Sequence, residues 1–366
     1  AGWTPERFAG ADEMPFRGWE SVTVPGAVSA WCELREKFGT CDLTSLLEPA
    51  ARYAEDGFIV TPIIGELWRR GGETLRDQPG FAEAFLPGGR APRPGERFRN
   101  PDQARSLRAI AESNGRAFYE GDLAEKITAF AAEHGAALSR EDLATYQPEW
   151  CGTISTGFDQ IDLHEIPPNG QGIAALMALG MLEATGLREL EADDPRALHL
   201  QIEAIKRALA DAYAYVAETP AMQPVTPQAL LDPGYLARRA EGIDPARAGD
   251  PGAGAPLHGG TVYLTAADES GMMVSFIQSN YSGFGSGVVV PGTGVSLQNR
   301  GAGFTLAKGH PNEVGPRKRP FHTIIPGFAT KDGAPLLSFG VMGGHMQHQG
   351  QVQMMVRCVL WGQNPQ

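Results

Sequence analysis

The sequence predicts an α+β fold in which helices cover two stacked antiparallel sheets. Three features of the 366-residue chain lead to this class: helical periodicity in the middle, two strand pairs after it, and one more helical pattern near the end. With 42% hydrophobic residues, a chain of this length can bury a sizeable core.

The first half of the chain is predicted to be mostly helical. Residues 1–100 alternate short helical pieces with Pro/Gly loops. Leu123 and Ile127 fall on one face of a predicted helix. Ser139-Arg-Glu-Asp142 then carries the sequence of a capping box, which predicts the start of another short helix.

Two longer helices and a region without periodicity come next. Residues 173–182 are almost all apolar, which is typical of a buried helix, and an apolar spacing of three or four predicts a helix over 196–217. Residues 219–260 are rich in Pro, Gly and Ala and show little periodicity. A stretch of this length is expected to be functional or mobile, and we interpret it as a linker.

The last third of the chain is predicted to be rich in β-strands. Alternating apolar residues flank two turn sequences, Asp268-Glu-Ser-Gly271 and Lys331-Asp-Gly333, so each is expected to close a hairpin. The predicted ranges are 262–267 with 272–279, 321–329 with 335–340, and a final helix over 346–361.

The junction of Gly260 and Thr261 is the most informative point in the chain. A threonine hydroxyl is a poor nucleophile until a nearby base removes its proton, and a free α-amino group on the same residue can be that base. An internal threonine gains this amine only if the preceding peptide bond is cut, and glycine leaves its carbonyl open to attack. The simpler interpretation is that Thr261 merely opens a strand, because β-branched residues favour strands.

Several separated segments resemble the γ-glutamyltranspeptidase family of N-terminal-nucleophile hydrolases. Their order and spacing carry the resemblance, which runs through most of the chain. The matching segments are Val24-Pro-Gly26 with Trp31, Gly115-Arg-Ala-Phe-Tyr-Glu-Gly121, Pro167-Pro-Asn-Gly-Gln-Gly172, Glu203-Ala-Ile-Lys206 with Asp211, Thr261 to Asp268, Phe284-Gly-Ser-Gly287, Leu297-Gln-Asn299, and Gly340-Val-Met-Gly-Gly344.

The resemblance implies a four-layer αββα sandwich, cleavage before Thr261, and an acyl-enzyme on the threonine oxygen. A large-subunit portion, 1–260, and a small-subunit portion, 261–366, would together form one structural domain. Ser279 stands where the family often has a threonine that supports the nucleophile. Gly343 and Gly344 match the pair whose backbone N–H groups stabilise the oxyanion, although a Gly-Gly pair can also simply separate a strand from a helix.

The substrate pocket implied by the resemblance is altered. The position of an acidic residue that holds a substrate α-amino group falls on Gly303, while Arg300 and Tyr281 replace amide side chains. His322 and Thr323 replace a serine pair that binds the α-carboxylate. Arg300 could bind a carboxylate or form a surface salt bridge. We therefore expect a carboxylate-bearing amide without an α-amino group, such as an oxamate-like or glutaryl-like acyl donor, to fit better than a γ-glutamyl group.

Three functions are carried forward from the sequence. The first is a self-cleaving γ-glutamyltranspeptidase-like amidohydrolase or acyltransferase, the second an oxamate-type or glutaryl acylase with the same nucleophile, and the third an inactive relative that only binds small carboxylates. No cofactor is expected, and the expected partner besides the small-molecule substrate is a second copy or the other self-cleaved fragment. The family normally extends beyond both ends of this chain, which is therefore expected to be an incomplete version of the fold.

Composition excludes some other classes. A net charge of -12 argues against a nucleic-acid partner, and no apolar run reaches the roughly 18 residues of a membrane helix. The four cysteines show no metal-ligand spacing.

His345 and His348 have the spacing of a metal pair on a helix, but ordinary histidines are favoured because neither a carboxylate nor a third histidine is near. Tyr213 is expected to serve packing. The start of the chain has neither a signal pattern nor an initiator methionine, so a leader or a longer N-terminal segment is expected to be missing. The compartment is left open, with the cytoplasm favoured over the periplasm.

Overall fold

The computed structural model describes residues 2–251 and 260–364, and of Gly260 and Thr261 it describes only the backbone. The chain divides into two compact units. Unit 1 contains residues 2–150, 282–302 and 315–317, and unit 2 contains 151–251, 260–281, 303–314 and 318–364. This division does not follow the predicted boundary at Gly260, so the two predicted subunit portions stay a prediction. Within the described ranges, no helix has both the length and the apolar character needed to cross a bilayer.

Unit 1 is mainly helical. The predicted helix with Leu123 and Ile127 on one face is confirmed, and the capping box of Ser139 and Asp142 is formed. The first hundred residues contain longer helices than predicted, because Asp42 caps one helix and Pro62 starts another. The helices are α1 Ala27–Phe38, α2 Leu43–Asp56, α3 Pro62–Leu75, α4 Phe81–Phe85, α5 Pro101–Glu112, α6 Arg116–Tyr119, α7 Asp122–Glu133 and α8 Arg140–Ala144, with short strand pairs β1 Phe58–Ile59 with β2 Arg97–Phe98 and β7 Val289–Val290 with β8 Val295–Ser296.

Unit 2 is built on an antiparallel sheet with the strand order β10-β9-β4-β3. Its strands are β3 Ile154–Phe158, β4 Ile161–Glu165, β9 Gly327–Lys331 and β10 Ala334–Phe339. The predicted hairpin around Asp332 is confirmed as β9 and β10. Residues 321–326, predicted as part of a strand, are not strand; His322 instead makes an isolated bridge to Gly170.

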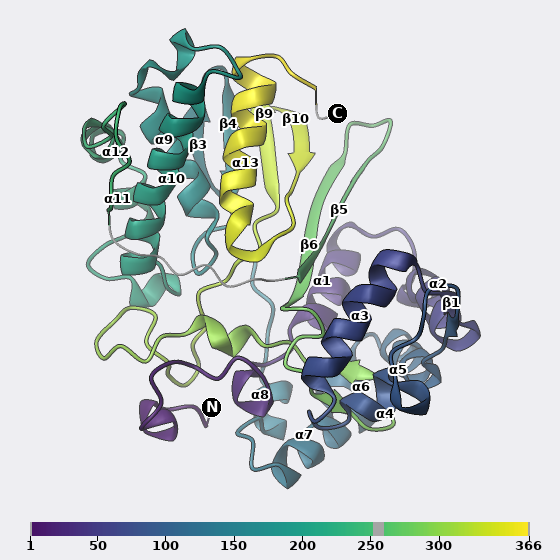
Figure 1. Cartoon of the computed structure of the whole chain (residues 1–366). Coiled ribbons are helices and arrows are strands. Elements are labelled where there is room, and N and C mark those ends of the chain that lie inside the picture. The colour runs from purple at the N-terminus through teal and green to yellow at the C-terminus, as the bar shows by residue number, and fades with distance from the viewer. Residues whose placement is uncertain (1, 252–259, 365–366) are drawn as a thin grey trace. The chain divides into compact units, whose positions relative to one another are not determined.

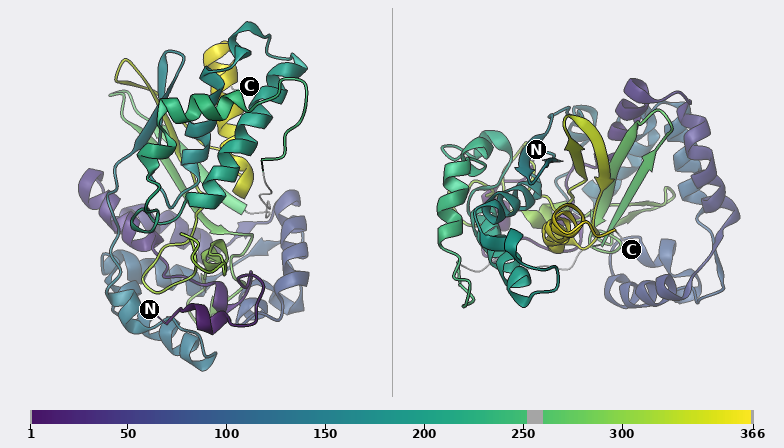
Figure 2. Two further views of the ribbon diagram at one scale, coloured as in Figure 1. Left: turned by 90° about the vertical axis from the view of Figure 1, so that its left-hand side faces the viewer. Right: turned by 90° about the horizontal axis from the view of Figure 1, so that it is seen from above.

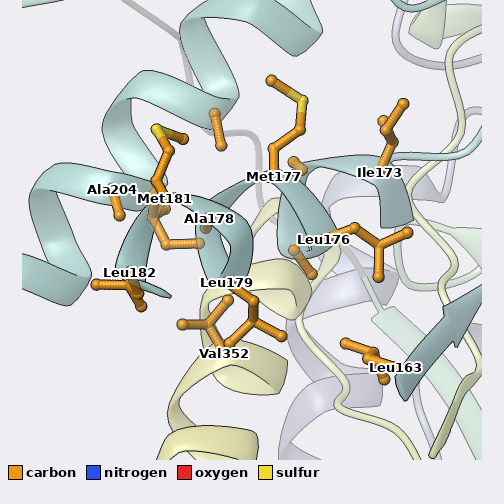
Figure 3. Packing of buried hydrophobic residues seen from close by; sticks show 14 of the residues in the cluster. Leu163, Ile173, Leu176, Met177, Ala178, Leu179, Met181, Leu182, Ala204 and Val352 are labelled. Carbon is orange, nitrogen blue, oxygen red and sulfur yellow. The ribbon is translucent and has the colours of Figure 1, made fainter. Parts of the chain in front are cut away.

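Helix α9 Gly172–Glu183 packs against β3 and β4 of this sheet, and α10 Pro195–Tyr215 packs on α9 and on α13 Gln347–Met355 (Figure 1). Predicted helices at 173–182 and 196–217 are confirmed as α9 Gly172–Glu183 and α10 Pro195–Tyr215. The last predicted helix is α13 Gln347–Met355, which continues as a π-helical turn over Val356–Leu360. Figure 3 shows Leu163 of β4, Leu179 of α9 and Val352 of α13 converging in the core, where all three are 0% exposed.

A second, two-stranded sheet consists of β5 Gly260–Ala267 and β6 Met273–Tyr281, as predicted (Figure 2). One face of this hairpin contacts β9 and β10: the hydroxyl of Ser275 donates to the carbonyl of Gly327 at 2.9 Å, and the ring of Tyr263 lies against Gly340. The other face carries Val262 and Leu264, which are exposed. Helices packed on antiparallel strands confirm the predicted α+β class.

The predicted linker 219–260 is wrong in its first part. Residues 227–241 form α11 Pro227–Leu230 and α12 Pro233–Glu241, since Thr226 and Asp232 cap them and a proline occupies the first turn of each. Leu236 is 3% exposed in the core of unit 2. Residues 252–259 lie outside the described part of the chain.

Candidate active site

The N-terminal end of β5 contains an irregularity in strand pairing at Thr261. Gly260 pairs with Tyr281 and Val262 with Gln278, so the register shifts between them. This pairing leaves Ser279 and Asn280 of β6 opposite the single residue Thr261. A bulge of this kind is frequent beside active sites. The backbone therefore brings the predicted nucleophile and its predicted support, Ser279, to facing positions on two paired strands.

Tyr281 ends β6 in an unusual conformation. Its φ angle is +77°, in the left-handed region that bulky residues avoid. Its backbone N–H donates to the Ser279 hydroxyl at 2.8 Å, and its phenol oxygen lies 3.0 Å from Nε2 of His345. Because the side chain is 3% exposed, these contacts are shielded from solvent. Strain of this kind persists only where the surrounding structure holds it, and it concentrates at functional sites.

His345 is held between two phenols. Its Nδ1 lies 2.9 Å from the hydroxyl of Tyr213, and its ring stacks on Phe321 with an interplanar angle of 7°. Burial raises the pKa of Tyr213 to about 12, and the nearby Tyr281 adds to the shift, so Tyr213 keeps its proton at neutral pH. Tyr213 packs against the core of unit 2 and beside Phe321, as expected, and its hydroxyl also contacts the His345 ring. Sequence reasoning missed its hydrogen bond to His345.

The described residues contain no cluster of three or more His, Cys, Asp or Glu side chains that could hold a metal ion. His348, predicted as an ordinary histidine, is 1% exposed, and burial lowers its pKa to about 3, with His345 adding to the effect. His348 is therefore a neutral core residue.

Gly343 and Gly344 form the turn that leads from β10 into α13. Their φ angles are +146° and +60°, which only glycine adopts without strain. The carbonyl of Gly343 accepts a hydrogen bond from Met346 at 3.2 Å. Since His345 follows Gly344 directly and contacts Tyr281, this turn is connected to the end of β6 where Gly260 pairs.

The segment with His322 and Thr323 is attached to the N-terminal end of α9. The backbone N–H of His322 donates to the carbonyl of Asn169 at 3.0 Å. The carbonyl of His322 accepts a hydrogen bond from the backbone N–H of Gln171 at 2.9 Å. The side chain of Gln171 donates to the carbonyls of both Thr323, at 2.8 Å, and Gly344, at 2.9 Å. Gln171 is 0% exposed. Gln171 stands at the N-cap position of α9, but its side chain makes no capping hydrogen bond, so no local sequence signal points to its role.

The resemblance places an acidic residue of the family at the position of Gly303, and the structure gives a steric reason why a glycine stands there. A Cβ atom at Gly303 would collide with the carbonyl oxygen of Phe321. The carbonyl of Gly303 also accepts a hydrogen bond from the side chain of Asn312 at 2.7 Å, and the Asn312 oxygen accepts from the backbone N–H of Phe321 at 2.9 Å. This backbone arrangement leaves no room for a carboxylate-bearing side chain.

Arg300 lies in unit 1, so its predicted part in the same pocket stays a prediction. It is 5% exposed, and its backbone N–H donates to the side chain of Gln298. The alternative of a surface salt bridge is wrong because the side chain is buried.

Known proteins resemble this chain over its whole length. A family model described as gamma-glutamyltranspeptidase matches residues 1–366. An oxamate amidohydrolase proenzyme from Klebsiella pneumoniae is 39% identical over 98% of this chain and 68% of its own length. A glutathione hydrolase-like proenzyme from Bacillus subtilis is 36% identical over 99% of this chain and 69% of its own length. The crystal structure of a cephalosporin acylase from Bacillus halodurans is 44% identical, covers 100% of this chain and 68% of its own, and superposes with a TM-score of 0.93.

Proposed function

Because the chain belongs to the γ-glutamyltranspeptidase family, we propose that it is an N-terminal threonine amidohydrolase that cuts itself between Gly260 and Thr261. The resemblance, the N-terminal-nucleophile hydrolase fold and the class of amide-cleaving enzymes predicted from the sequence are confirmed by the similarities to known proteins. The assignment of individual residues is our proposal. One observation supports it: the pairing irregularity in β5 places Thr261 opposite Ser279. The next pair, Gly260 with Tyr281, is linked to the glycine turn through the contact of Tyr281 with His345.

Self-cleavage begins at the carbonyl of Gly260. The Thr261 hydroxyl loses its proton and attacks this carbonyl carbon, the C–N bond breaks, and the nitrogen takes up a proton, so that an ester replaces the peptide bond. Water then hydrolyses the ester. The products are a carboxylate on Gly260 and a free α-amino group on Thr261. A side chain at position 260 would obstruct the attack, and glycine has none.

Substrate cleavage repeats the same chemistry on another carbonyl. The free amine of Thr261 takes the proton of the hydroxyl, the oxygen attacks the substrate amide, and the leaving amine receives that proton. Backbone N–H groups of Gly343 and Gly344 donate to the oxyanion that forms, while Ser279 supports the nucleophile across the strand pair. Water, or an amine acceptor, then releases the acyl group and regenerates the threonine.

The substrate we assign is an amide whose acyl part carries a carboxylate and lacks an α-amino group. The collision of any side chain at Gly303 with Phe321 supports this, because an ammonium group would have no counter-charge from that position. Relatives named as an oxamate amidohydrolase and a cephalosporin acylase agree with it. Within unit 2 we assign the carboxylate contacts to His322 and Thr323, with Tyr281 as a further substrate-binding residue; the contact of Arg300, in unit 1, stays a prediction from the family resemblance. A γ-glutamyl substrate is the second candidate, favoured by the glutathione hydrolase-like relative.

Denaturing mass spectrometry of the purified chain tests the nucleophile. The wild type should give two fragments that meet at Gly260/Thr261, and Thr261→Ala should give one intact chain without amidase activity. Thr261→Ser is the matched control, because it keeps a hydroxyl and should still be cut. An intact wild-type chain that binds glutarate would support instead the inactive relative that only binds small carboxylates. Full activity in Thr261→Ala would refute the proposed nucleophile.

A further inference from the structure

The side chain of Gln171 connects two segments that carry predicted site residues. Its Nε2 atom donates one hydrogen bond to the carbonyl of Thr323 and one to the carbonyl of Gly344, at 2.8 and 2.9 Å. The backbone N–H of the same residue donates to the carbonyl of His322 at 2.9 Å. All three donor hydrogens of Gln171 are therefore used on these two segments.

The orientation of the amide follows from its neighbours. Two carbonyl oxygens face the same end of the Gln171 side chain, and only the NH₂ end can donate to both. A reversed amide would place three oxygen acceptors together. The Oε1 atom of Gln171 is buried and has no hydrogen-bond partner among the described residues, which costs stability. The contribution of this side chain therefore lies in its two donors.

The Gly344 turn needs such an anchor. Consecutive glycines have more accessible backbone conformations than any other pair of residues, so an oxyanion site built on them must be fixed by contacts from outside the turn. Gln171 holds the peptide plane between Gly344 and His345 from one side, while Tyr281 holds the His345 ring from the other. Gln171 lies at the buried N-terminal end of α9, where Gly172 and Ile173, both buried, follow it.

We infer that Gln171 is a positioning residue that fixes the oxyanion turn at Gly344 and the substrate segment at Thr323 in one geometry. Because Gln171 is 0% exposed, it acts through these backbone carbonyls and does not touch the substrate. The inference rests on the proposed function, since it assigns Gln171 to the same reaction. Both self-cleavage and amide hydrolysis pass through an oxyanion, so both should depend on it.

The test uses Gln171→Met, which keeps the length of the side chain and removes both donors. On the fully cleaved fraction, kcat should fall roughly 10- to 100-fold, with a smaller change in KM, and self-cleavage should slow by a similar factor. Gln171→Glu keeps the shape more closely and offers at most one donor, so it should show the same loss and serves if the first variant fails to fold.

Gln201→Met is the matched control. Gln201 is also buried, at 4% exposure, but its Nε2 donates to the carbonyl of Ala197 within its own helix. Thermal unfolding should show a loss of stability in both methionine variants, whereas kcat should fall only in Gln171→Met. Wild-type kcat in folded Gln171→Met and Gln171→Glu, or an equal loss of kcat in Gln201→Met, would overturn the inference. If Thr261→Ala is inactive while the Gln171 variants are fully active, only the role of Gln171 fails; if Thr261→Ala is active, the proposed function itself fails.

Discussion

The phenol oxygen of Tyr281 lies 3.0 Å from Nε2 of His345. Tyr281 pairs with Gly260 at the start of β5, and His345 follows Gly344 at the start of the last helical segment. This one contact therefore links the strand that carries the predicted nucleophile to the turn that carries the predicted oxyanion donors. Both ends of the link belong to unit 2, so it does not depend on unit 1.

Removal of that link should slow turnover. Tyr281→Phe deletes only the hydroxyl, leaves a partly buried nitrogen of His345 without this partner, and should lower kcat about tenfold, the equivalent of about 1.4 kcal/mol. Tyr235→Phe is a matched control, because the Tyr235 hydroxyl donates to Asp211 at 2.8 Å in another part of unit 2. Steady-state kinetics should show a normal kcat for the control. Equal rates in the two variants would show that the Tyr281 hydroxyl is dispensable.

Gly344→Ala should damage the oxyanion turn. The φ angle of +60° at Gly344 disfavours alanine by about 1–2 kcal/mol, and the displaced N–H should cost on the order of 100-fold in kcat. Gly362 has nearly the same φ angle, +61°, and a Cβ there meets open space, so Gly362→Ala separates backbone strain from catalysis. The prediction is contradicted if both alanine variants retain the wild-type rate.

The substrate assignment predicts a preference between two anilides. Glutaryl anilide has the same chain length as γ-glutamyl anilide and lacks the α-amino group, so it should have the higher kcat/KM. Arg300→Lys should reduce kcat/KM for the glutaryl compound, because lysine keeps the charge but loses the bidentate fork. A higher kcat/KM for the γ-glutamyl compound would reverse our interpretation of Gly303 and favour the second candidate.

Stability should fall as the pH rises through the neutral range. Burial raises the pKa of Glu165 from 4.5 to about 8, which Gln351 offsets only in part, so the folded chain holds a proton that the unfolded chain has released. Between these values, unfolding releases this proton and is favoured by increasing pH. His348 has the opposite effect, but only below its ordinary value of 6.5.

Thermal unfolding between pH 6.5 and 8 isolates the contribution of Glu165. The melting temperature of the wild type should decrease over this interval, and the decrease should be smaller in Glu165→Gln. Glu191→Gln, at an exposed position, should keep the slope of the wild type. Parallel slopes for all three proteins would mean that Glu165 is ionised in the folded state.

Local patterns predicted much of unit 2 correctly. The hairpin of β5 and β6 and the buried helix α9 each carry their signal within one segment. The hairpin of β3 and β4 was missed, since Glu165 occupies a buried position after Ile161 and Leu163 and breaks the apolar alternation. Residues 321–326 were predicted as strand from their apolar side chains. Such side chains also occur in a buried loop, so this pattern could not distinguish the two.

The site could be predicted only as far as its motifs reach. Thr261, Ser279 and the two glycines follow from a family resemblance, whereas the contacts that connect them do not. The hydrogen bond from Tyr213 to His345 joins residues 132 positions apart, and the bond from Gln171 to Gly344 joins residues 173 apart. Contacts at such separations depend on how strands and helices pack, which no short motif encodes.

The central sheet of unit 2 draws its strands from both sides of the proposed cut. β4 precedes Gly260 and β9 follows it, yet the two are neighbours, with Leu163 opposite Ala329. The core likewise combines α9 with Val352 and Met355 of α13. Scission before Thr261 would thus leave two polypeptides that share one sheet and one hydrophobic core. Neither polypeptide could dissociate without exposing this core to water, so the two would remain one particle until a denaturant separates them.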